Sequence, residues 1–295
     1  MTSAAAFAPA KVNLFLHVGG PGADGYHPLC SLMVFADVGD RLTAAPAASL
    51  DLQLQGTFAG ELSAGPDNLV MRAAAALAGG LRPPGAAMIL DKRLPVASGL
   101  GGGSSDAGAA LRLLRRLWRS ECSDDDLRAI AAGLGADGAA CLWGRPVLAQ
   151  GRGERLSAAP ELPVLHAVLV NAGAPVATAE VYRRFDAARR FSDVTPPPVP
   201  AAFPTTASVA DWLGRQRNDL EGSAIVAEPR VGAVLALLGA QPEVLLARMS
   251  GSGGTCFALC AEAAEAQRLA ARLATLQPAW WSVATRLGGS WPDPD

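Results

Sequence analysis

The groups of this chain best suited to bind a ligand are concentrated in a glycine-rich run, Pro95–Ser105, which reads P-V-A-S-G-L-G-G-G-S-S. Glycine lets a backbone approach a ligand closely and point several N–H groups at it. A predicted helix follows the run and would add the positive end of its dipole, which favours anions. The pattern therefore predicts a cradle for phosphate groups. The residues expected to form it are Pro95, Val96, Ala97, Ser98, Gly99, Leu100, Gly101, Gly102, Gly103, Ser104 and Ser105.

Two familiar phosphate-binding patterns are absent from this run. No G-K-[ST] closes it, as a Walker A loop requires, and it lacks the G-x-G-x-x-G with a ribose-binding acid that marks a Rossmann site. The alternative interpretation is a flexible glycine hinge. A hinge needs neither two serines nor an apolar helix directly after it, so the phosphate interpretation is favoured.

Only two of the 25 basic residues are lysines, Lys11 and Lys92. Since the chain uses arginine almost everywhere else, a retained lysine indicates a position that needs a compact ammonium group rather than the planar guanidinium group of arginine. This argument favours a functional role for Lys11. For Lys92, a functional role and survival by chance remain equally open.

Asp137 is the carboxylate best placed in the sequence to accept a proton. It follows Gly133 and Gly135 on a predicted turn and does not lie on a charged helix face. A lysine nearby would keep it ionised and therefore able to act as a base. The alternative is that Asp137 caps a helix, a common use of aspartate after glycine. One residue can do both, and the catalytic interpretation is favoured.

The composition excludes several classes of protein. Among 295 residues, 50% are hydrophobic and 18% are charged, and the net charge of −2 with scattered basic residues argues against nucleic acid or anionic lipid as partners. No apolar run approaches the roughly 18 residues of a membrane span, and no basic residue precedes the apolar N-terminus as in a signal peptide. The five cysteines form neither a C-x-x-C pair nor a zinc-type cluster, so we expect reduced thiols in a cytoplasmic protein.

The elements that must position these residues are strands and helices without strict βαβ alternation, which favours an α+β fold. The expected strands are 11–18, 29–35, 41–44, 50–55, 87–91, 146–150, 164–171, 244–248, 255–260 and 281–287. The expected helices are 67–78, 107–118, one that starts at the N-cap Ser123 and stops at Gly133 or Gly135, 180–190, 208–215, 224–228, 231–238 and 261–276.

We expect two domains, because a cleft forms readily between domains. The predicted boundaries are 1–160 for an N-terminal nucleotide-binding domain and 161–295 for a C-terminal domain. The proline-rich segment 195–204 cannot be a regular element and is predicted to be a surface loop. A monomer and a homodimer remain equally open.

Three motifs resemble those of the GHMP kinase superfamily, in that superfamily's order and approximate spacing. They are A-P-A-K-V-N-L-F-L-H-V at Ala8–Val18, the glycine run with its continuation S-D-A, and M-S-G-S-G-G-T-C-F-A-L at Met249–Leu259. The resemblance implies a ribosomal-protein-S5-like N-terminal domain, a ferredoxin-like C-terminal domain, and ATP and Mg²⁺ as cofactors.

Five shorter motifs resemble one family of that superfamily, the 4-diphosphocytidyl-2-C-methyl-D-erythritol kinases. They are A-D-G-Y-H at 23–27, D-N-L at 67–69, D-K-R-L-P at 91–95, L-G-A-D at 134–137 and N-D-L-E at 218–221. The resemblance covers nearly the whole chain. It implies phosphorylation by ATP of the 2-hydroxyl of a cytidine diphosphate-linked sugar alcohol, in the non-mevalonate route to isoprenoid precursors.

The resemblance also implies a role for individual residues. Asp137 corresponds to the base and Lys11 to the cation that steadies the developing charge. Tyr26 and His27 correspond to residues that hold the cytosine, Tyr182 to a second stacking aromatic, and Asn13 to a hydrogen-bonding partner of the substrate. Asn68 corresponds to a residue that meets adenine, and Ser105 is the expected magnesium contact.

The sequence departs from the family in two places. G-A-A-C-L-W-G follows Asp137 where a Val-Pro pair and an aromatic residue are usual, and Gly254 replaces an alanine of the third motif. A homoserine or mevalonate kinase remains an alternative, although A-D-G-Y-H argues against it. A nucleotide-binding regulator without catalysis is a second alternative, disfavoured by the presence of both Lys11 and Asp137.

Overall fold

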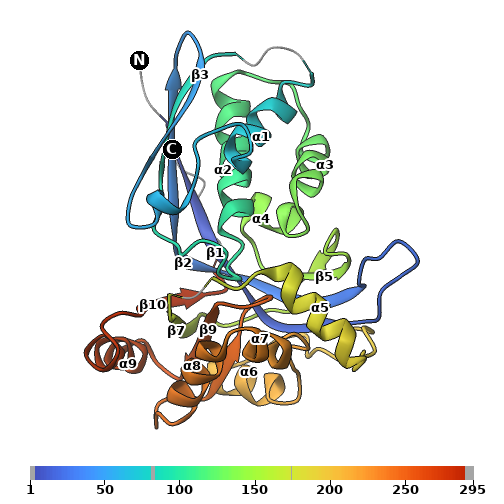
Figure 1. Cartoon of the computed structure of the whole chain (residues 1–295), viewed down its shortest axis with the longest axis vertical. Helices are drawn as coiled ribbons and strands as arrows, with labels where there is room; N and C mark the ends of the chain where they lie inside the picture. Colours follow the sequence, from blue (N-terminus) through green and yellow to red (C-terminus); the bar gives the residue numbers. More distant parts are fainter. Residues whose placement is uncertain (1–3, 81–83, 174, 290–295) are drawn as a thin grey trace.

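Two long antiparallel strands run through the whole molecule and connect its two halves (Figure 1). They are β1 (Ala4–Val18) and β2 (Leu29–Pro46), and the loop between them projects from the side of the molecule. This description rests on a computed structural model that covers residues 4–80, 84–173 and 175–289.

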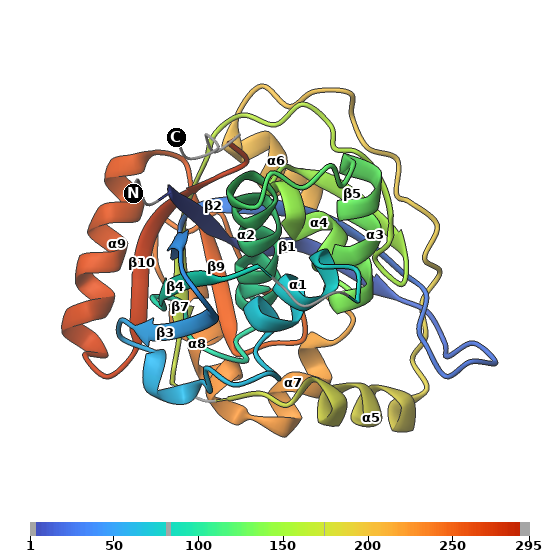
Figure 2. The ribbon, with the colours of Figure 1, turned by 90° about the horizontal axis from the view of Figure 1, so that it is seen from above.

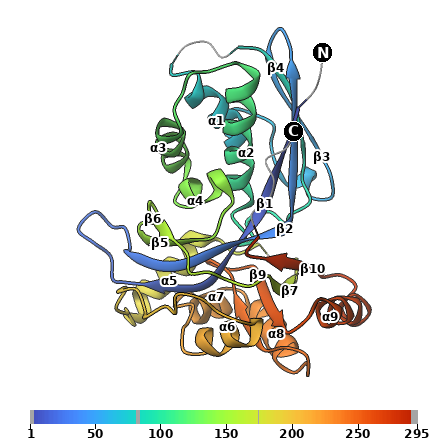
Figure 3. The same ribbon diagram turned by 180° about the vertical axis from the view of Figure 1, so that it is seen from behind.

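The upper half in Figure 1 is a sheet built on β2, with helices on one face. Its further strands are β3 (Leu50–Gln55), β4 (Ala86–Asp91), β5 (Val147–Gly151) and β6 (Arg155–Ala158). β4 pairs with the last part of β2 and β5 with its first part. Figure 3 shows the helices of this half on one side of the long strands. They are α1 (Leu69–Leu77), α2 (Gly102–Leu117), α3 (Asp124–Leu134) and α4 (Gly138–Trp143), and a 3₁₀ turn lies at Ala59–Glu61.

The lower half is a four-stranded antiparallel sheet in the order β10-β7-β9-β8, which is the ferredoxin-like order 4-1-3-2. Its strands are β7 (Leu165–Asn171), β8 (Leu246–Met249), β9 (Thr255–Cys260) and β10 (Trp281–Leu287). Its helices are α5 (Thr178–Ala188), α6 (Thr206–Leu213), α7 (Glu221–Ala227), α8 (Pro229–Gly239) and α9 (Ala263–Leu276). Figure 2 shows α9 beside β10. The predicted α+β class is confirmed.

One of the hydrophobic clusters spans both halves of the molecule. A single cluster of buried side chains joins Val12 and Phe15 of β1 to Trp212 of α6 and Phe257 of β9. In addition, β10 pairs with β2 through Leu287 and Ala36. The strands before residue 160 thus belong to one sheet and those after it to the other, while packing is continuous across the junction. The boundary itself stays a prediction.

One predicted break in a strand is wrong. The segments 29–35 and 41–44 were expected as separate strands. Instead β2 is continuous, and each of its two aspartates has partners elsewhere in the fold. Asp37 accepts hydrogen bonds from Thr285 and Arg286 of β10, and Asp40 is fully buried against Lys92. These partners lie far away in the sequence, so local patterns could not predict them.

Helix ends are largely as expected, with one exception. Ser123 caps α3 in a reciprocal capping box with Asp126, and Gly135 follows its last residue. In contrast, the helix expected from residue 107 begins earlier, at Gly102, because the glycines of the cradle form its first turn. The five cysteines are unpaired in the structure, and four of them are buried. Among the described residues, no helix is long and apolar enough to cross a membrane.

His17 of β1 is buried, and its Nε2 has no hydrogen-bond partner among the described residues. Burial lowers the pKa of His17 to about 4, and the positive charge of Arg217 acts in the same direction. The folded state therefore holds this imidazole neutral, whereas in the unfolded chain it titrates with the ordinary value of 6.5.

We expect the stability that depends on neutral His17 to be lost as pH falls from 6.5 toward 4, because the folded state binds this proton less tightly than the unfolded state. Between neutral pH and about pH 4.5, the wild type should lose about 2 kcal/mol more unfolding free energy than His17→Phe. Urea unfolding of both proteins at the two pH values measures the difference. Equal losses would contradict this assignment.

Candidate active site

A cavity of about 750 Å³ lies between the glycine run, β1, α5 and the turn between β8 and β9. Side chains and backbone from both halves of the molecule line it. From the glycine run come Pro95, Val96, Ala97, Ser98, Gly99, Gly101, Gly102, Gly103 and Ser104. Of the residues predicted to form the cradle, only Leu100 and Ser105 lie outside this lining.

The glycine run packs closely against its neighbours, so that a side chain is excluded at Gly99 and would be crowded at Gly101. A Cβ on Gly99 would lie 2.4 Å from the carbonyl oxygen of Ser250, and one on Gly101 would lie 3.1 Å from Cε of Lys11. Both glycines also have positive φ, +77° and +62°. Helix α2 begins directly after Gly101, which offers no side-chain cap. The first N–H groups of α2 thus have no capping side chain and border the cavity, as an anion site requires.

The turn between β8 and β9 holds the glycine run from the other half of the molecule. Ser250 Oγ donates to Gly99 O at 3.0 Å, and the N–H of Thr255 donates to Ser98 O at 2.9 Å. Asn218 Nδ2 in turn donates to the carbonyls of Met249 and Gly251 at 2.9 and 2.8 Å. The glycine run and the turn within Met249–Leu259, which are the second and third motifs, are therefore hydrogen-bonded to each other. Asn218, in N-D-L-E, supports it without lining the cavity.

Lys11, Asn13 and Asp137 converge on one side of the cavity. Lys11 Nζ lies 3.1 Å from Asp137 Oδ2 and donates to Asn13 Oδ1 at 2.6 Å. The lysine side chain is 3% exposed and that of the aspartate 30%, so the carboxylate is the more accessible partner. The N–H of Lys11 also donates to Leu100 O at 2.8 Å, which fixes β1 against the glycine run. The structure thus brings together two groups predicted to act together.

Asp137 occupies the N-cap position of α4, but its side chain makes no capping hydrogen bond. The capping alternative therefore does not account for its carboxylate. Cys141, one turn later, packs against the glycine run with its Sγ 3.9 Å from Gly101 O. Burial raises the pKa of this thiol to about 12, and the nearby carboxylate of Asp137 adds to the shift. Cys141 is accordingly a neutral packing residue.

The other lysine, Lys92, is also at the cavity, in a different setting. Its buried Nζ donates to Asp40 Oδ2 at 2.6 Å and to Asp106 Oδ2 at 2.7 Å. Burial alone would lower the pKa of Lys92, but Asp106 and Asp40 raise it, so the ammonium stays charged. Burial raises the pKa of Asp106 to about 7, against the opposing effect of Lys92. The sequence signals for this cluster were the rarity of lysine and two motifs of the family resemblance, D-K-R-L-P with Lys92 and S-D-A with Asp106.

Three residues predicted to contact ligands differ in whether they line the cavity and whether their polar groups are already hydrogen-bonded within the protein. Tyr182 of α5 lines the cavity, with its phenol pKa raised to about 12 by burial. Asn68 lines it as well, but it also caps α1, with Oδ1 accepting from the N–H of Val70. Ser105 is fully buried, and its hydroxyl donates to Pro9 O at 2.7 Å. The structure therefore disfavours Ser105 as a magnesium ligand and places the hydroxyl of Ser104 at the cavity instead.

Tyr26 and His27 lie beside the cavity and not in its lining. Tyr26 is 60% exposed, and the guanidinium of Arg152 covers one face of its ring at 4.2 Å from the centroid. His27 contacts the ring of Tyr182 with centroids 5.0 Å apart, and its Nε2 lies 3.2 Å from Asp186. His27 thus connects the loop after β1 to helix α5. Arg152 was not singled out in the sequence, because it lies 126 positions after Tyr26.

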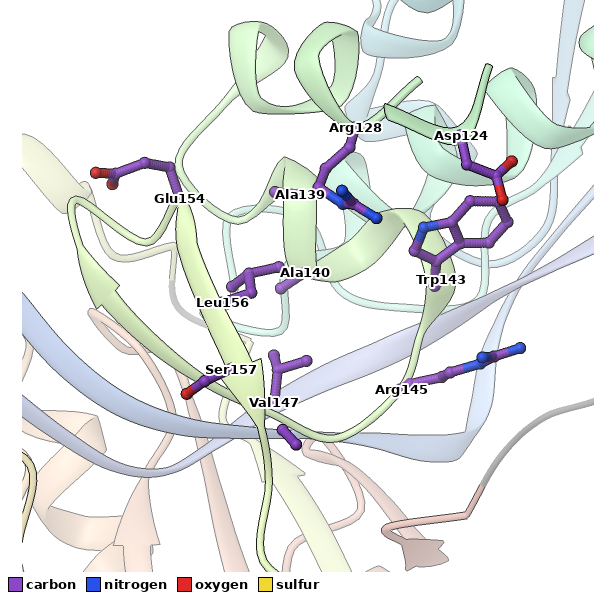
Figure 4. Close-up of a pocket in the computed structure, with 11 residues that line it drawn as sticks. Asp124, Arg128, Ala139, Ala140, Trp143, Arg145, Val147, Glu154, Leu156 and Ser157 are labelled. Atoms are coloured by element: carbon purple, nitrogen blue, oxygen red, sulfur yellow. The ribbon is translucent and has the colours of Figure 1, made fainter. Parts of the chain in front are cut away.

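A second cavity, of about 630 Å³, lies on the outer side of α4 (Figure 4). Ala139, Ala140 and Trp143 of α4 form one wall of this second cavity, and neither Lys11 nor Asp137 lines it. In Figure 4, the side chain of Glu154 points away from the other labelled residues. The segment after Asp137 therefore has two environments. Cys141 packs against the glycine run, whereas Ala139, Ala140 and Trp143 line the second cavity.

Comparison with protein families gives two matches along the chain. Residues 68–145 match the model described as "GHMP kinases N terminal domain", and residues 204–278 match "GHMP kinases C terminal". The chain is 58% identical to the 4-diphosphocytidyl-2-C-methyl-D-erythritol kinase of a Caulobacter species, over 96% of this chain and 98% of the relative. It is 50% identical to the kinase of the same name from Hyphomonas neptunium, over 98% of both chains.

Solved structures give a consistent result. A crystal structure of 4-(cytidine 5'-diphospho)-2C-methyl-D-erythritol kinase superposes with a TM-score of 0.75 at 36% identity, over 97% of this chain and 99% of that one. Homoserine kinase from Cytophaga hutchinsonii gives 0.68 at 20% identity, over 99% and 96%. Mevalonate kinase from Methanococcus jannaschii gives 0.64 at 12% identity, over 98% of both. The last two likenesses show a shared fold alone.

Gly99→Ala should separate the glycine run from the turn after β8, because its Cβ would overlap the Ser250 carbonyl and its φ is positive. We expect a loss of unfolding free energy of about 2 kcal/mol or more. Gly133→Ala is the matched control. A Cβ there meets nothing within 4 Å on helix α3, so the change should stabilise by about 0.5–1 kcal/mol. Urea unfolding compares both variants with the wild type, and equal effects would refute the argument.

Proposed function

The chain belongs to the 4-diphosphocytidyl-2-C-methyl-D-erythritol kinase family of GHMP kinases, and we propose that it transfers the γ-phosphoryl group of ATP to the 2-hydroxyl of that cytidyl substrate. The product would be the 2-phosphate, in the methylerythritol phosphate route to isoprenoid precursors. One observation supports this most strongly: the carboxylate of Asp137 and the ammonium of Lys11 lie 3.1 Å apart beside a glycine-rich anion cradle.

These groups suit each step of an in-line phosphoryl transfer. The acceptor hydroxyl gives its proton to the Asp137 carboxylate as its oxygen bonds to the γ-phosphorus, and the bond from that phosphorus to the bridging oxygen breaks to release ADP. Lys11 holds Asp137 in place and stabilises the charge on the transferred group. The N–H groups at the start of α2 bind the phosphates.

Magnesium fits this site as a partner of the nucleotide. No group of three or more His, Cys, Asp or Glu side chains among the described residues could hold a metal alone. That absence suits Mg²⁺, which keeps most of its ligands as water and phosphate and here would draw on the Ser104 hydroxyl. When bound, the ion would neutralise phosphate charge.

The residues for the acceptor surround the other end of the cavity. Asn13 lines it next to Lys11, and its Nδ2 donates to Ser31 Oγ at 2.7 Å, so the amide is held in one orientation beside the reacting groups. Tyr182 presents an aromatic ring for stacking, with His27 behind it. We propose that Tyr26 closes over the cytosine from the loop after β1, and that Asn68 contacts the adenine.

The remaining proposals concern the setting of the enzyme. We propose a cytoplasmic enzyme that acts as a monomer or homodimer, with residues 1–160 carrying the nucleotide and residues 161–295 completing the acceptor site. Contact between Lys11 and Asp137 argues against a regulator that binds nucleotide without catalysis.

Asp137→Asn should reduce kcat by about 10²–10⁴-fold, because the amide cannot accept the hydroxyl proton. Binding of a non-hydrolysable ATP analogue should be unchanged within a small factor. Steady-state kinetics and calorimetric titration measure the two quantities. Asp125→Asn, an exposed change on α3, is the control and should behave as the wild type. Wild-type turnover in Asp137→Asn would show that this residue is not the base.

The acceptor assignment predicts selective ATP consumption. The purified protein should turn over ATP with the cytidyl substrate and not with homoserine or mevalonate. An assay of ADP release with each alcohol in turn tests this directly. Activity on homoserine or mevalonate without activity on the cytidyl substrate would overturn the assignment while leaving a kinase of this fold.

A further inference from the structure

We propose that Lys92 is a positioning residue for the nucleotide, because with Asp40 and Asp106 it fixes both ends of the glycine run at the separation that the cradle needs. This inference rests on the proposed kinase function. The three side chains, called here the Lys92 triad, come from β2, the end of β4 and α2.

The Lys92 triad connects the residues that enter the cradle to those that leave it. At the entry, Asp40 Oδ1 accepts hydrogen bonds from the N–H groups of Arg93 and Leu94 at 2.6 and 2.9 Å. At the exit, Asp106 lies in the second turn of α2 and accepts from Lys92 at 2.7 Å. One ammonium group therefore ties both ends of the run to the middle of β2.

The position of the ammonium suits direct control of the cradle. A Cβ on Gly102 would lie 3.0 Å from Lys92 Nζ, so the charge lies directly against the first turn of α2. Lys92 and Asp106 also line the cavity where the ligand binds. Movement of this lysine would therefore move the N–H groups that bind phosphate.

The charge balance indicates that the triad does more than fill space. Two carboxylates face one ammonium, and Asp106 Oδ1 is buried without a hydrogen-bond partner among the described residues. Ionisation of a second buried carboxyl group beside one ammonium is unfavourable, as the pKa of Asp106, raised by burial, shows, and its charged form would also oppose binding of a triphosphate. A cradle for anions would have a more favourable electrostatic potential without Asp106. We therefore infer that Asp106 is present for its hydrogen bond with Lys92, which holds the start of α2 in place.

A pair of substitutions at Asp106 separates charge from tether. Asp106→Asn and Asp106→Ala both remove the ionisable carboxyl group, but only the asparagine keeps an oxygen that accepts from Lys92. We expect Asp106→Asn to bind the β,γ-imido analogue of ATP, with Mg²⁺, at least as tightly as the wild type. Asp106→Ala should bind it about tenfold more weakly than Asp106→Asn, as loss of one hydrogen bond to a charged group implies.

Steady-state kinetics and melting temperature complete the test. In Asp106→Ala, KM for ATP should rise while KM for the cytidyl substrate stays within about twofold, because the acceptor end of the cavity does not contact the triad. Lys92→Met/Asp40→Asn/Asp106→Asn, which removes the tether without leaving a buried charge unpaired, should show the same split if Asp106→Ala folds poorly. Arg230→Met, which removes an exposed cation on α8, should match the wild type in every measurement.

Two results would overturn the proposal: equal analogue affinity in Asp106→Ala and Asp106→Asn, or parallel losses for both substrates together with a lowered melting temperature. Wild-type turnover of the cytidyl substrate tests the proposed function separately, so failure of one does not imply failure of the other.

Discussion

The active site depends on close contact between the backbone of the glycine run and the backbone of two other segments, β1 and the turn after β8. The glycine run touches the Ser250 turn on one side and Lys11 of β1 on another. These three segments come from both halves of the molecule, and the core beneath them is continuous. The cradle therefore exists only when both halves are folded together, which explains how three motifs so far apart in the chain form one site.

The two lysines show how the number of neighbouring carboxylates decides what a cation does. Lys11 pairs with one carboxylate, Asp137, which remains partly accessible, so both groups can act on a ligand. Lys92 pairs with two carboxylates that are almost completely buried. Its charge is balanced within the protein by these two ion pairs.

The proposed acceptor side of the cavity differs in composition from the proposed phosphate side. The glycine run lines the proposed phosphate side, whereas the side chains proposed to meet the acceptor are Asn13 of β1 and Tyr182 of α5, with the exposed Tyr26 outside the lining. A rigid cradle suits the triphosphate, which has the same geometry in every ATP. Side chains on separate elements suit an acceptor, because they can be exchanged to select another alcohol.

The sequence alone determined the local features, namely the glycine run, the rare Lys11, the capped helix after Ser123 and most strand positions, because each depends on neighbours a few residues away. Only the tertiary structure decided the continuity of β2 through Asp37 and Asp40, the ion pairs of Lys92 and the burial of Ser105. It also decided the distance between Lys11 and Asp137. The family resemblance predicted that these two residues act together but gave no distance between them. Burial and ion pairing in these cases join residues far apart in the chain, and a local pattern carries no information about partners at that distance.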